Sequence, residues 1–307
     1  MYQKLINHLY RYPKSKWKTI QRFGGLMSYR KMLAGKQEMR KASALLPAIV
    51  SIPDGYRIYF LTGQDYLYQT LFCAFSLTKV SKTPFQFILI DDGSFDQDLT
   101  NQATTQMPGV KIITKEEIMA NLEAKLPAKD YPYLHNKRKV YPHIKKLIDV
   151  HTLEDGDYKL VLDSDMLFWN EPKEIIDWLK NPTGTLHMID CEESYGYNKN
   201  LMELLCKAKI PEMVNVGTIG LNSKSINWMT VEYWAKTLEE TEGASYFLEQ
   251  ALSAMIIANQ NQIQLDGAEY LVNPNEHQIK NQTKLYHYVD ISKKYYFEIA
   301  WRKIMYK

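Results

Sequence analysis

The sequence contains few cysteines, glycines and prolines, and it has no long apolar run. Its three cysteines are an odd number without C-x-x-C spacing, which argues against a disulfide framework or a structural zinc knot and indicates a reducing compartment. With 14 glycines and 12 prolines in 307 residues, collagen-like and low-complexity structures are excluded. No stretch approaches the roughly 20 apolar residues that span a bilayer, and Lys4, Asn7 and His8 interrupt the region where a signal peptide would be apolar. We therefore expect a cytoplasmic protein.

The composition is typical of a globular protein, but the charge is unevenly distributed along the chain. The net charge is +3, yet residues 1–50 carry 11 basic residues against the single acid Glu38. Five apolar residues in this arm follow the spacing of an amphipathic helix: Tyr2, Leu5, Ile6, Leu9 and Tyr10. We expect Pro13 to end this helix. Either the arm contacts an anionic membrane surface from the inner face, or it packs on the main domain with solvated lysines. We do not expect nucleic acid as a partner, because no known binding module accompanies the charge.

After Pro53 the chain alternates short apolar runs with helical stretches. We expect strands at 57–62, 85–90, 110–113 and 158–162, and helices at 65–79, 95–106, 115–125 and 137–150. Such alternation predicts an α/β fold with a mostly parallel sheet flanked by helices. The predicted organisation is a basic helical N-terminal arm, residues 1–50, followed by one domain, residues 51–307. Ligands are then expected at the carboxyl ends of the strands.

The residues that follow the strands carry the chemical signal. Neither G-x-G-x-x-G nor G-x-x-x-x-G-K-[ST] occurs, which argues against a dinucleotide-binding Rossmann fold and excludes a P-loop. Instead Asp163 and Asp165 follow the strand at 158–162 and offer hard oxygen ligands to Mg²⁺ or Mn²⁺, which can clamp a diphosphate. About four acid-x-acid pairs are expected by chance in this composition. This pair, however, lies between apolar residues, where unpaired charge would be costly to bury.

The D-x-D sequence, followed by Asn170, Glu171 and Pro172, resembles the metal site of the GT-A-fold glycosyltransferases. In that Rossmann-related superfamily the acids hold a divalent ion on the diphosphate of a nucleotide sugar. The resemblance extends to a fixed order of four features: D-x-D, a glycine-bearing loop, an acid on a later helix and a histidine near the C-terminus.

Each of the last three features has a candidate. Val214 to Thr218 is similar to the F-N-x-G segment of glycosyltransferase family eight, which implies that Asn215 contacts sugar hydroxyls and that the backbone at Gly217 approaches a ligand. The acid and its neighbour would be Glu249 and Gln250, and His287 would be the third metal ligand. The complete H-x-x-G-x-x-K-P-W ending expected near His287 does not occur. The downstream residues that replace its phosphate contacts would be Lys293, Lys294, Trp301 and Arg302.

Further donor contacts are expected at the strand ends and before the helix at 137–150. These residues are Thr62, Gly63, Asp91, Asp92, Ser164 and the basic group His135, Lys137, Arg138 and Lys139, with Arg138 the main phosphate candidate. Each candidate also has a purely structural interpretation. Asp91 and Asp92 can form a turn, Glu249 can be a solvated helix residue and His287 a packed histidine, and the basic group can simply be solvated.

We therefore predict a metal-dependent glycosyltransferase that moves a sugar, with a UDP-sugar favoured as donor, to a glycan or lipid-linked acceptor in surface glycan assembly. A retaining enzyme would use Glu249 or Gln250 to stabilise the oxocarbenium-like centre, whereas an inverting one would use Glu249 as general base. One alternative is a haloacid-dehalogenase-like phosphatase, although Leu167 stands where that fold expects Thr or Val. The other is a catalytically silent nucleotide-sugar-binding protein.

Overall fold

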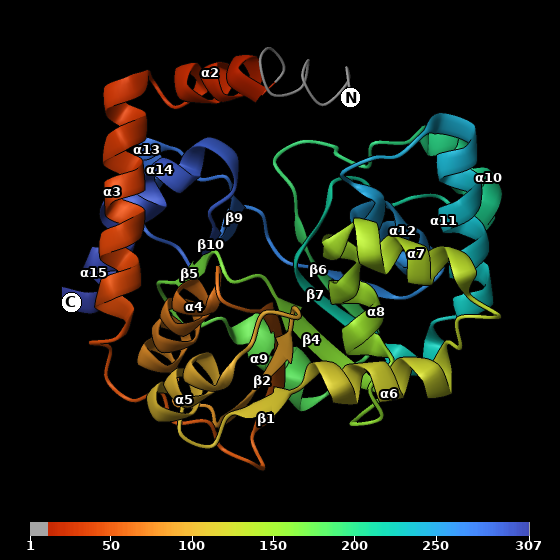
Figure 1. The fold of residues 1–307 in the computed structure, drawn as a ribbon, viewed down its shortest axis with the longest axis horizontal. Helices are drawn as coiled ribbons and strands as arrows, with labels where there is room; N and C mark the ends of the chain where they lie inside the picture. Colours follow the sequence, from red (N-terminus) through yellow and green to blue (C-terminus); the bar gives the residue numbers. More distant parts are fainter. Residues whose placement is uncertain (1–11, 307) are drawn as a thin grey trace.

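The structure, a computed structural model, describes residues 12–306, so the helix expected over residues 2–10 lies outside the described residues. A seven-stranded sheet in the order β3-β2-β1-β4-β7-β6-β8 forms its centre, with helices on both faces (Figure 1). The strands are β1 (Tyr56–Thr62), β2 (Phe85–Asp91), β3 (Lys111–Ile113), β4 (Tyr158–Leu162), β6 (Thr185–Ile189), β7 (Val214–Asn222) and β8 (Gln262–Gln264). Only β7 runs antiparallel to its neighbours, β4 and β6. The predicted α/β fold with a mostly parallel sheet is confirmed.

Side chains along the central strands point alternately to the two faces of the sheet, and an apolar core lies on each face. In β1, Ile58 and Phe60 join one apolar cluster and Tyr59 the other, as expected for side chains that alternate across a pleated strand. The first cluster is covered by α4 (Leu67–Val80) and α5 (Gln97–Gln106). The second is covered by α6 (Lys115–Lys125), α7 (Pro132–Val140), α8 (Lys145–His151), α10 (Lys199–Cys206), α11 (Trp228–Glu242) and α12 (Leu248–Ile257).

One predicted helix is wrong. The stretch 137–150, expected as a single helix, is divided between α7, a 3₁₀ turn at Pro142–Ile144 and α8. The cause is Pro142, which lacks a backbone N–H and disfavours helical backbone in the residue before it. Tyr141 is accordingly extended, with φ −134° and ψ 85°. The break directs α8 separately toward the edge of the sheet that carries the D-x-D residues.

A second, three-stranded sheet has the order β5-β10-β9 and was not predicted. Its strands are β5 (Met166–Phe168), β9 (Tyr270–Val272) and β10 (Leu285–His287). Antiparallel pairing of β10 with β5 sets His287 opposite Met166, and the backbone N–H of Tyr288 donates to the carbonyl of Asp165 over 2.9 Å. This pairing brings a histidine from near the C-terminus to the D-x-D segment.

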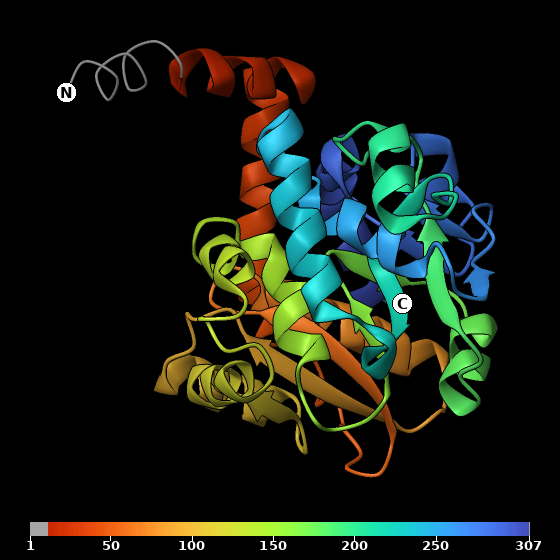
Figure 2. The same cartoon turned by 90° about the vertical axis from the view of Figure 1, so that its right-hand side faces the viewer.

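From residue 12 onward the N-terminal arm contains two helices, α2 (Tyr12–Arg22) and α3 (Leu26–Ser43). Pro13, expected to end a helix, stands in the first turn of α2, a position that proline tolerates. As Figures 1 and 2 show, α2 lies across one end of the molecule and α3 runs down beside the last helices of the chain. The division of the chain at residue 50 remains a prediction.

α3 packs closely on the C-terminal segment that follows β10. A methyl group at Gly35 would lie 2.3 Å from the carbonyl oxygen of Phe297, so the two backbones meet where only glycine fits. Lys31 and Glu298 are 3.0 Å apart, and Glu38 pairs with Arg302. Much of the arm is therefore part of the folded body.

The remaining helices lie between these elements or close the chain. They are α9 (Lys173–Lys180), α13 (Glu276–Lys280), α14 (Lys293–Tyr295) and α15 (Trp301–Tyr306), with 3₁₀ turns at Ser223–Ser225 and Asp290–Ser292 and a π-helical turn at Tyr296–Ala300. Within residues 12–306, none of the helices combines the length and the apolar character needed to cross a bilayer.

Candidate active site

A cleft of about 700 Å³ opens at the edge of the main sheet where β1, β2, β4 and β6 end and β7 begins. Polar side chains gather there because the carboxyl ends of these parallel strands and the amino end of the antiparallel β7 meet at one edge. Ten of the residues singled out from the sequence as site candidates line it: Asp92, Asp163, Ser164, Asp165, Asn215, Gly217, Glu249, Gln250, His287 and Lys293.

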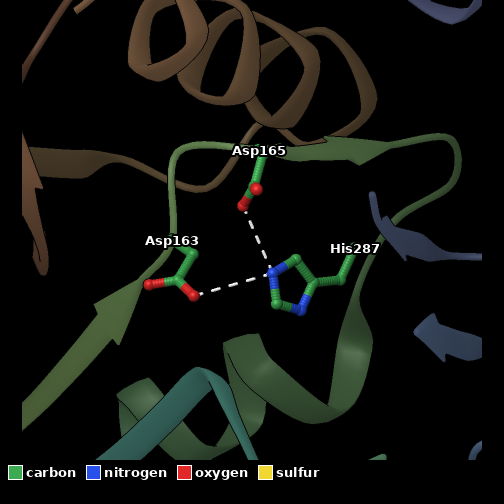
Figure 3. A group of neighbouring side chains, drawn as sticks. All are labelled: Asp163, Asp165 and His287. Carbon is green, nitrogen blue, oxygen red and sulfur yellow. Dashed lines mark ion pairs between the residues drawn. The ribbon is translucent and has the colours of Figure 1, made fainter. Parts of the chain in front are cut away.

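Three of these residues converge on one point (Figure 3). The ring atom Nε2 of His287 lies 3.2 Å from Oδ1 of Asp165 and 3.6 Å from Oδ2 of Asp163. One ligand atom from each residue falls within 4.8 Å of the others. The two carboxylates come from the loop between β4 and β5, and the imidazole comes from β10. The three residues thus form a candidate site for a divalent metal.

The hydrogen bonds around His287 test whether a metal fits. The backbone N–H of Gly217 donates to Oδ1 of Asn215 over 3.0 Å, which identifies that atom as an acceptor, and Nδ1 of His287 lies 3.1 Å from it. Nδ1 therefore carries the proton, and in the neutral ring Nε2 presents its lone pair to two carboxylates. Nε2 is buried and makes no hydrogen bond within the described part of the chain. A cation held between the three groups removes this repulsion, so the donor set fits a divalent ion.

Gly217 has a different neighbour from the one expected. A methyl group on this residue would lie 2.4 Å from the His287 ring, so the close backbone approach is to a metal-ligand candidate. The carbonyl of Gly217 also accepts the backbone N–H of Asp163 over 2.7 Å. The N-x-G segment therefore orients both sides of the triad.

Lys146, from α8, was not predicted, and it occupies the centre of the buried charges. Its Nζ lies 2.9 Å from Oδ1 of Asp163, 3.6 Å from Oε2 of Glu249 and 3.0 Å from the carbonyl of Val216. Burial alone would lower the pKa of Lys146, but the two carboxylates outweigh it and raise the pKa above its usual value. The only signal in the sequence is a lysine inside an apolar helical run, which is common on half-buried helices.

Glu249 is buried at the start of α12 and is not a solvated helix residue. Burial raises the pKa of Glu249 to about 7, against the opposing effect of Lys146. A carboxyl group that titrates near neutrality inside a cleft is typical of functional sites. Whether its carboxylate takes part in chemistry remains a prediction.

Asp190, directly after β6, is a second residue that the sequence did not reveal. Its Oδ2 accepts from Nδ2 of Asn215 over 2.9 Å and from Nε2 of Gln250 over 3.3 Å. It therefore links the side chain that orients His287 to the residue beside Glu249. An acid after a strand is too common for sequence alone to single it out.

The two lysines near the C-terminus that were expected to contact phosphate differ in position. Lys293 lines the cleft with its Nζ 3.3 Å from Oδ2 of Asp165, whereas Lys294 does not line it. Lys293 stands six residues after His287, as the lysine of H-x-x-G-x-x-K does, and Asp290 takes the glycine position with φ 47°. Burial would raise the pKa of Asp165, but opposing positive charge, above all the Lys293 ammonium, holds the pKa well below its usual value.

Trp301 and Arg302 do not line the cleft either. Trp301 is buried against Phe72, with ring centroids 5.6 Å apart, and Arg302 pairs with Glu38. Both residues hold the C-terminal helix in place.

Several predicted donor contacts have structural partners instead. Arg138 makes a bidentate ion pair with the buried Asp149, at 2.6 and 2.9 Å, and does not line the cleft. Lys137 pairs with Glu239. The reason is that α7, which ends before Pro142, directs these side chains toward α8 and α11.

The strand-end residues divide in the same way. Asp91 is buried and accepts the backbone N–H groups of Gly93 and Phe95, at 2.6 and 3.1 Å, so it holds a turn. Asp92 reaches the cleft, and Gly63 lies directly against its carboxylate. Thr62 is buried below the cleft, where its hydroxyl contacts Thr70, which in turn contacts Ser164.

Comparison with known proteins supports the fold. No protein-family model matches the chain. No curated protein sequence matches it either. Mouse xyloside xylosyltransferase 1, in its apo form, is 11% identical with a TM-score of 0.51, over 76% of this chain and 97% of its own. The galactosyltransferase LgtC, in complex with donor and acceptor sugar analogues, is 14% identical with a TM-score of 0.51, over 76% of this chain and 87% of its own.

A third solved structure, the bifunctional glycosyltransferase WbbM in its apo form, is 10% identical with a TM-score of 0.50, over 77% of this chain and 46% of its own. At these identities the likeness concerns the fold, and together with the sheet topology it shows that the chain has the GT-A fold of glycosyltransferases. The expectation drawn from the D-x-D context is confirmed to that extent.

Proposed function

We propose that this protein is a metal-dependent glycosyltransferase that transfers a sugar from a nucleotide diphosphate sugar to an acceptor hydroxyl. The observation that carries the proposal is the convergence of Asp163, Asp165 and Nε2 of His287, whose Nδ1 faces the acceptor oxygen of Asn215, inside the cleft of a GT-A fold. A phosphatase of the haloacid-dehalogenase type would need a different fold, and no observation favours it.

The roles of the residues follow from their positions. Asp163, Asp165 and His287 would hold the ion, for which we propose Mn²⁺ or Mg²⁺, and Asn215 orients the imidazole. The bound ion supplies positive charge where the departing diphosphate develops negative charge. Lys293 lies beside Asp165 at the cleft wall and adds a second cation for the same charge.

For the sugar itself we propose contacts from Asn215 and Asp190 at the cleft floor, with Glu249 and Gln250 next to the reacting carbon. A retaining enzyme would use the fixed oxygen atoms of Glu249 or Gln250 to stabilise the oxocarbenium-like centre. An inverting enzyme would use Glu249 as general base, and its raised pKa suits a group that accepts a proton near neutral pH.

Donor hydrolysis tests this proposal most directly. UDP-sugars, which we favour, and other nucleotide sugars are first screened by thermal shift with Mn²⁺, and the stabilising donors are then assayed for release of the nucleoside diphosphate with Mn²⁺, Mg²⁺ or chelator. We expect metal-dependent release that increases with the correct acceptor. Donor binding without release would identify a silent binding protein, and hydrolysis of simple phosphomonoesters would identify a phosphatase.

We further propose that the arm contacts an anionic membrane surface, where a lipid-linked or surface glycan acceptor is presented. Lys16, Trp17 and Lys18 of α2 are exposed, with Trp17 at 57%, and this combination is typical of interfacial helices. Because each lysine near such a surface contributes about 1 kcal/mol, neutralising Lys16 and Lys18 together should weaken binding to anionic vesicles about 30-fold at low salt.

The matched control neutralises two exposed lysines on other faces, Lys82 and Lys139. Equal losses in the two double variants would contradict a membrane surface on α2. Point substitutions are preferable to deletion of residues 1–50, because α3 packs on the C-terminal segment and its removal would disturb the fold.

A further inference from the structure

One ion pair joins the N-terminal arm to the rim of the active-site cleft. Arg22, the last residue of α2, pairs with Asp290, and both residues line the cleft together with Lys293. The side chain of Arg22 is 62% exposed and that of Asp290 is 32% exposed. The pair therefore lies at the mouth of the cleft, on the side where β10 delivers His287.

Asp290 adopts a backbone conformation that favours glycine. Its φ of 47° is in the left-handed region, which residues with a side chain rarely occupy. It stands three residues after His287 and three before Lys293. The backbone conformation of Asp290 therefore sets the direction of the chain between His287 and Lys293. The Nζ atom of Lys293 lies 3.3 Å from Asp165.

We propose that Arg22 is a positioning residue for the active site. By pairing with Asp290, it stabilises the left-handed turn over residues 288–293 (the Asp290 turn) and so keeps Lys293 directed into the cleft. This inference rests on the proposed function in one respect, because the group that Lys293 meets would be the donor diphosphate. The arm then has a task inside the active site that is separate from any contact with a membrane.

The C-terminal segment is also held by contacts with α3, so we expect the loss of Arg22 to affect only the residues near Asp290. Lys31 and Glu38 of α3 hold the C-terminal segment through their own ion pairs, and Gly35 packs on its backbone. An exposed ion pair such as Arg22–Asp290 contributes little to global stability. Loss of Arg22 should therefore leave the fold intact and loosen only the Asp290 turn.

The test compares Arg22→Gln with Arg30→Gln, which removes the same charge from an exposed position of the arm that does not line the cleft. We expect Arg22→Gln to raise the donor KM about fivefold with little change in kcat, because an exposed ion pair is worth at most about that factor. Arg22→Lys should restore part of the effect, and Arg30→Gln should behave as wild type. An unchanged donor KM in Arg22→Gln would overturn the proposal.

Asp290→Gly supplies the second half of the test. Glycine adopts a positive φ without strain, so this variant should keep a donor KM near that of wild type while losing the ion pair. Adding Arg22→Gln to Asp290→Gly should then cause no further change. If Arg22→Gln raises the donor KM equally in both backgrounds, Arg22 acts on the donor directly and the proposed positioning role is wrong.

A readout independent of activity separates this inference from the proposed function. Hydrogen–deuterium exchange of the backbone amides of residues 288–293 should become about fivefold faster in Arg22→Gln and stay unchanged in Arg30→Gln. Unchanged exchange in both variants would overturn the inference even for an active enzyme. Conversely, faster exchange in a protein that transfers no sugar would support the turn contact and refute the glycosyltransferase proposal.

Discussion

Two regions of this molecule are built by different rules. From β1 to β4, residues 56–162, elements that follow one another in the chain also lie close together in space, and β1 pairs in parallel with both β2 and β4. After Asp163 the order is rearranged, with β7 inserted between β4 and β6 and the second sheet joining β5, β10 and β9. The first region forms most of the scaffold, and the second brings the remaining active-site residues to its edge.

The candidate active site lies on the boundary between the two regions. Asp163 and Asp165 stand at the end of the first, whereas His287, Asn215, Glu249 and Lys293 all come from the second. Lys146 reaches across from the first region in the opposite direction, where it contacts Asp163 and Glu249. Substitutions at this boundary therefore show how strongly the two regions depend on each other.

The largest effect is expected for Lys146→Met, which removes the cation between the regions. The buried Glu249 and the partly exposed Asp163 would lose their common partner, and removing one partner of a buried ion pair costs up to about 3–5 kcal/mol. Urea unfolding of the metal-free protein measures the loss. The control, Lys139→Met on the exposed side of α7, should change the free energy of unfolding by less than about 0.5 kcal/mol. Equal stability of the two variants would mean that Lys146 does not join the regions energetically.

Removing a ligand from the first region should mainly affect activity. Asp165→Asn or Asp163→Asn keeps the side-chain volume but loses one carboxylate of a hard-cation site, so we expect turnover to fall by a factor on the order of 100 or more. Circular dichroism and thermal unfolding should show that the fold is retained. Wild-type turnover in either variant at saturating Mn²⁺ would refute the metal assignment.

The second region should be sensitive through His287 and its orienting partner. His287→Ala loses one proposed ligand, and Asn215→Ala loses the acceptor that fixes the proton on Nδ1. Both should raise the Mn²⁺ concentration for half-maximal activity, Asn215→Ala by about 10- to 100-fold. Asn222→Ala, at the other end of β7, provides the control. A metal titration that does not change in His287→Ala would make this residue a packed histidine.

The smallest effect is expected for Glu249→Gln, and it should depend on pH. The pKa of Glu249 is raised from its usual value near 4.5 to about 7 by burial, so ionisation opposes folding. The stability that the protonated group contributes is complete below pH 4.5 and is lost as the pH rises through 7. The free energy of unfolding of Glu249→Gln, relative to that of wild type, should therefore increase as the pH rises from 4.5 to 8. Urea unfolding with chelator present measures this difference.

The same substitution also tests chemistry, because retained turnover at saturating donor and acceptor would count against a chemical role for the carboxylate of Glu249. A difference in stability that does not vary with pH would show that Glu249 is ionised throughout, held so by Lys146.

The first region was largely predictable because its signals are local. Strand and helix positions follow from apolar periodicity, and the end of β4 follows from the change to Asp163. The single error, one helix over 137–150, arose where Pro142 divides a pattern that otherwise continues. Basic residues before this break were expected at a phosphate, but α7 turns Arg138 to Asp149.

Sequence alone determined the α/β fold and the residue types that meet in the candidate metal site, because the D-x-D acids, the N-x-G segment and a late histidine are readable as residue types in a fixed order. Only the tertiary structure decided that Lys146 and Asp190 belong to the site, that Lys293 rather than Lys294 lines it, and that Arg22 of the arm lies at its mouth. The physical reason is that a common residue acquires a role only through its neighbours. Pairing of β10 with β5, the break before α8 and the packing of α3 on the C-terminal segment create those neighbours between residues far apart in the chain.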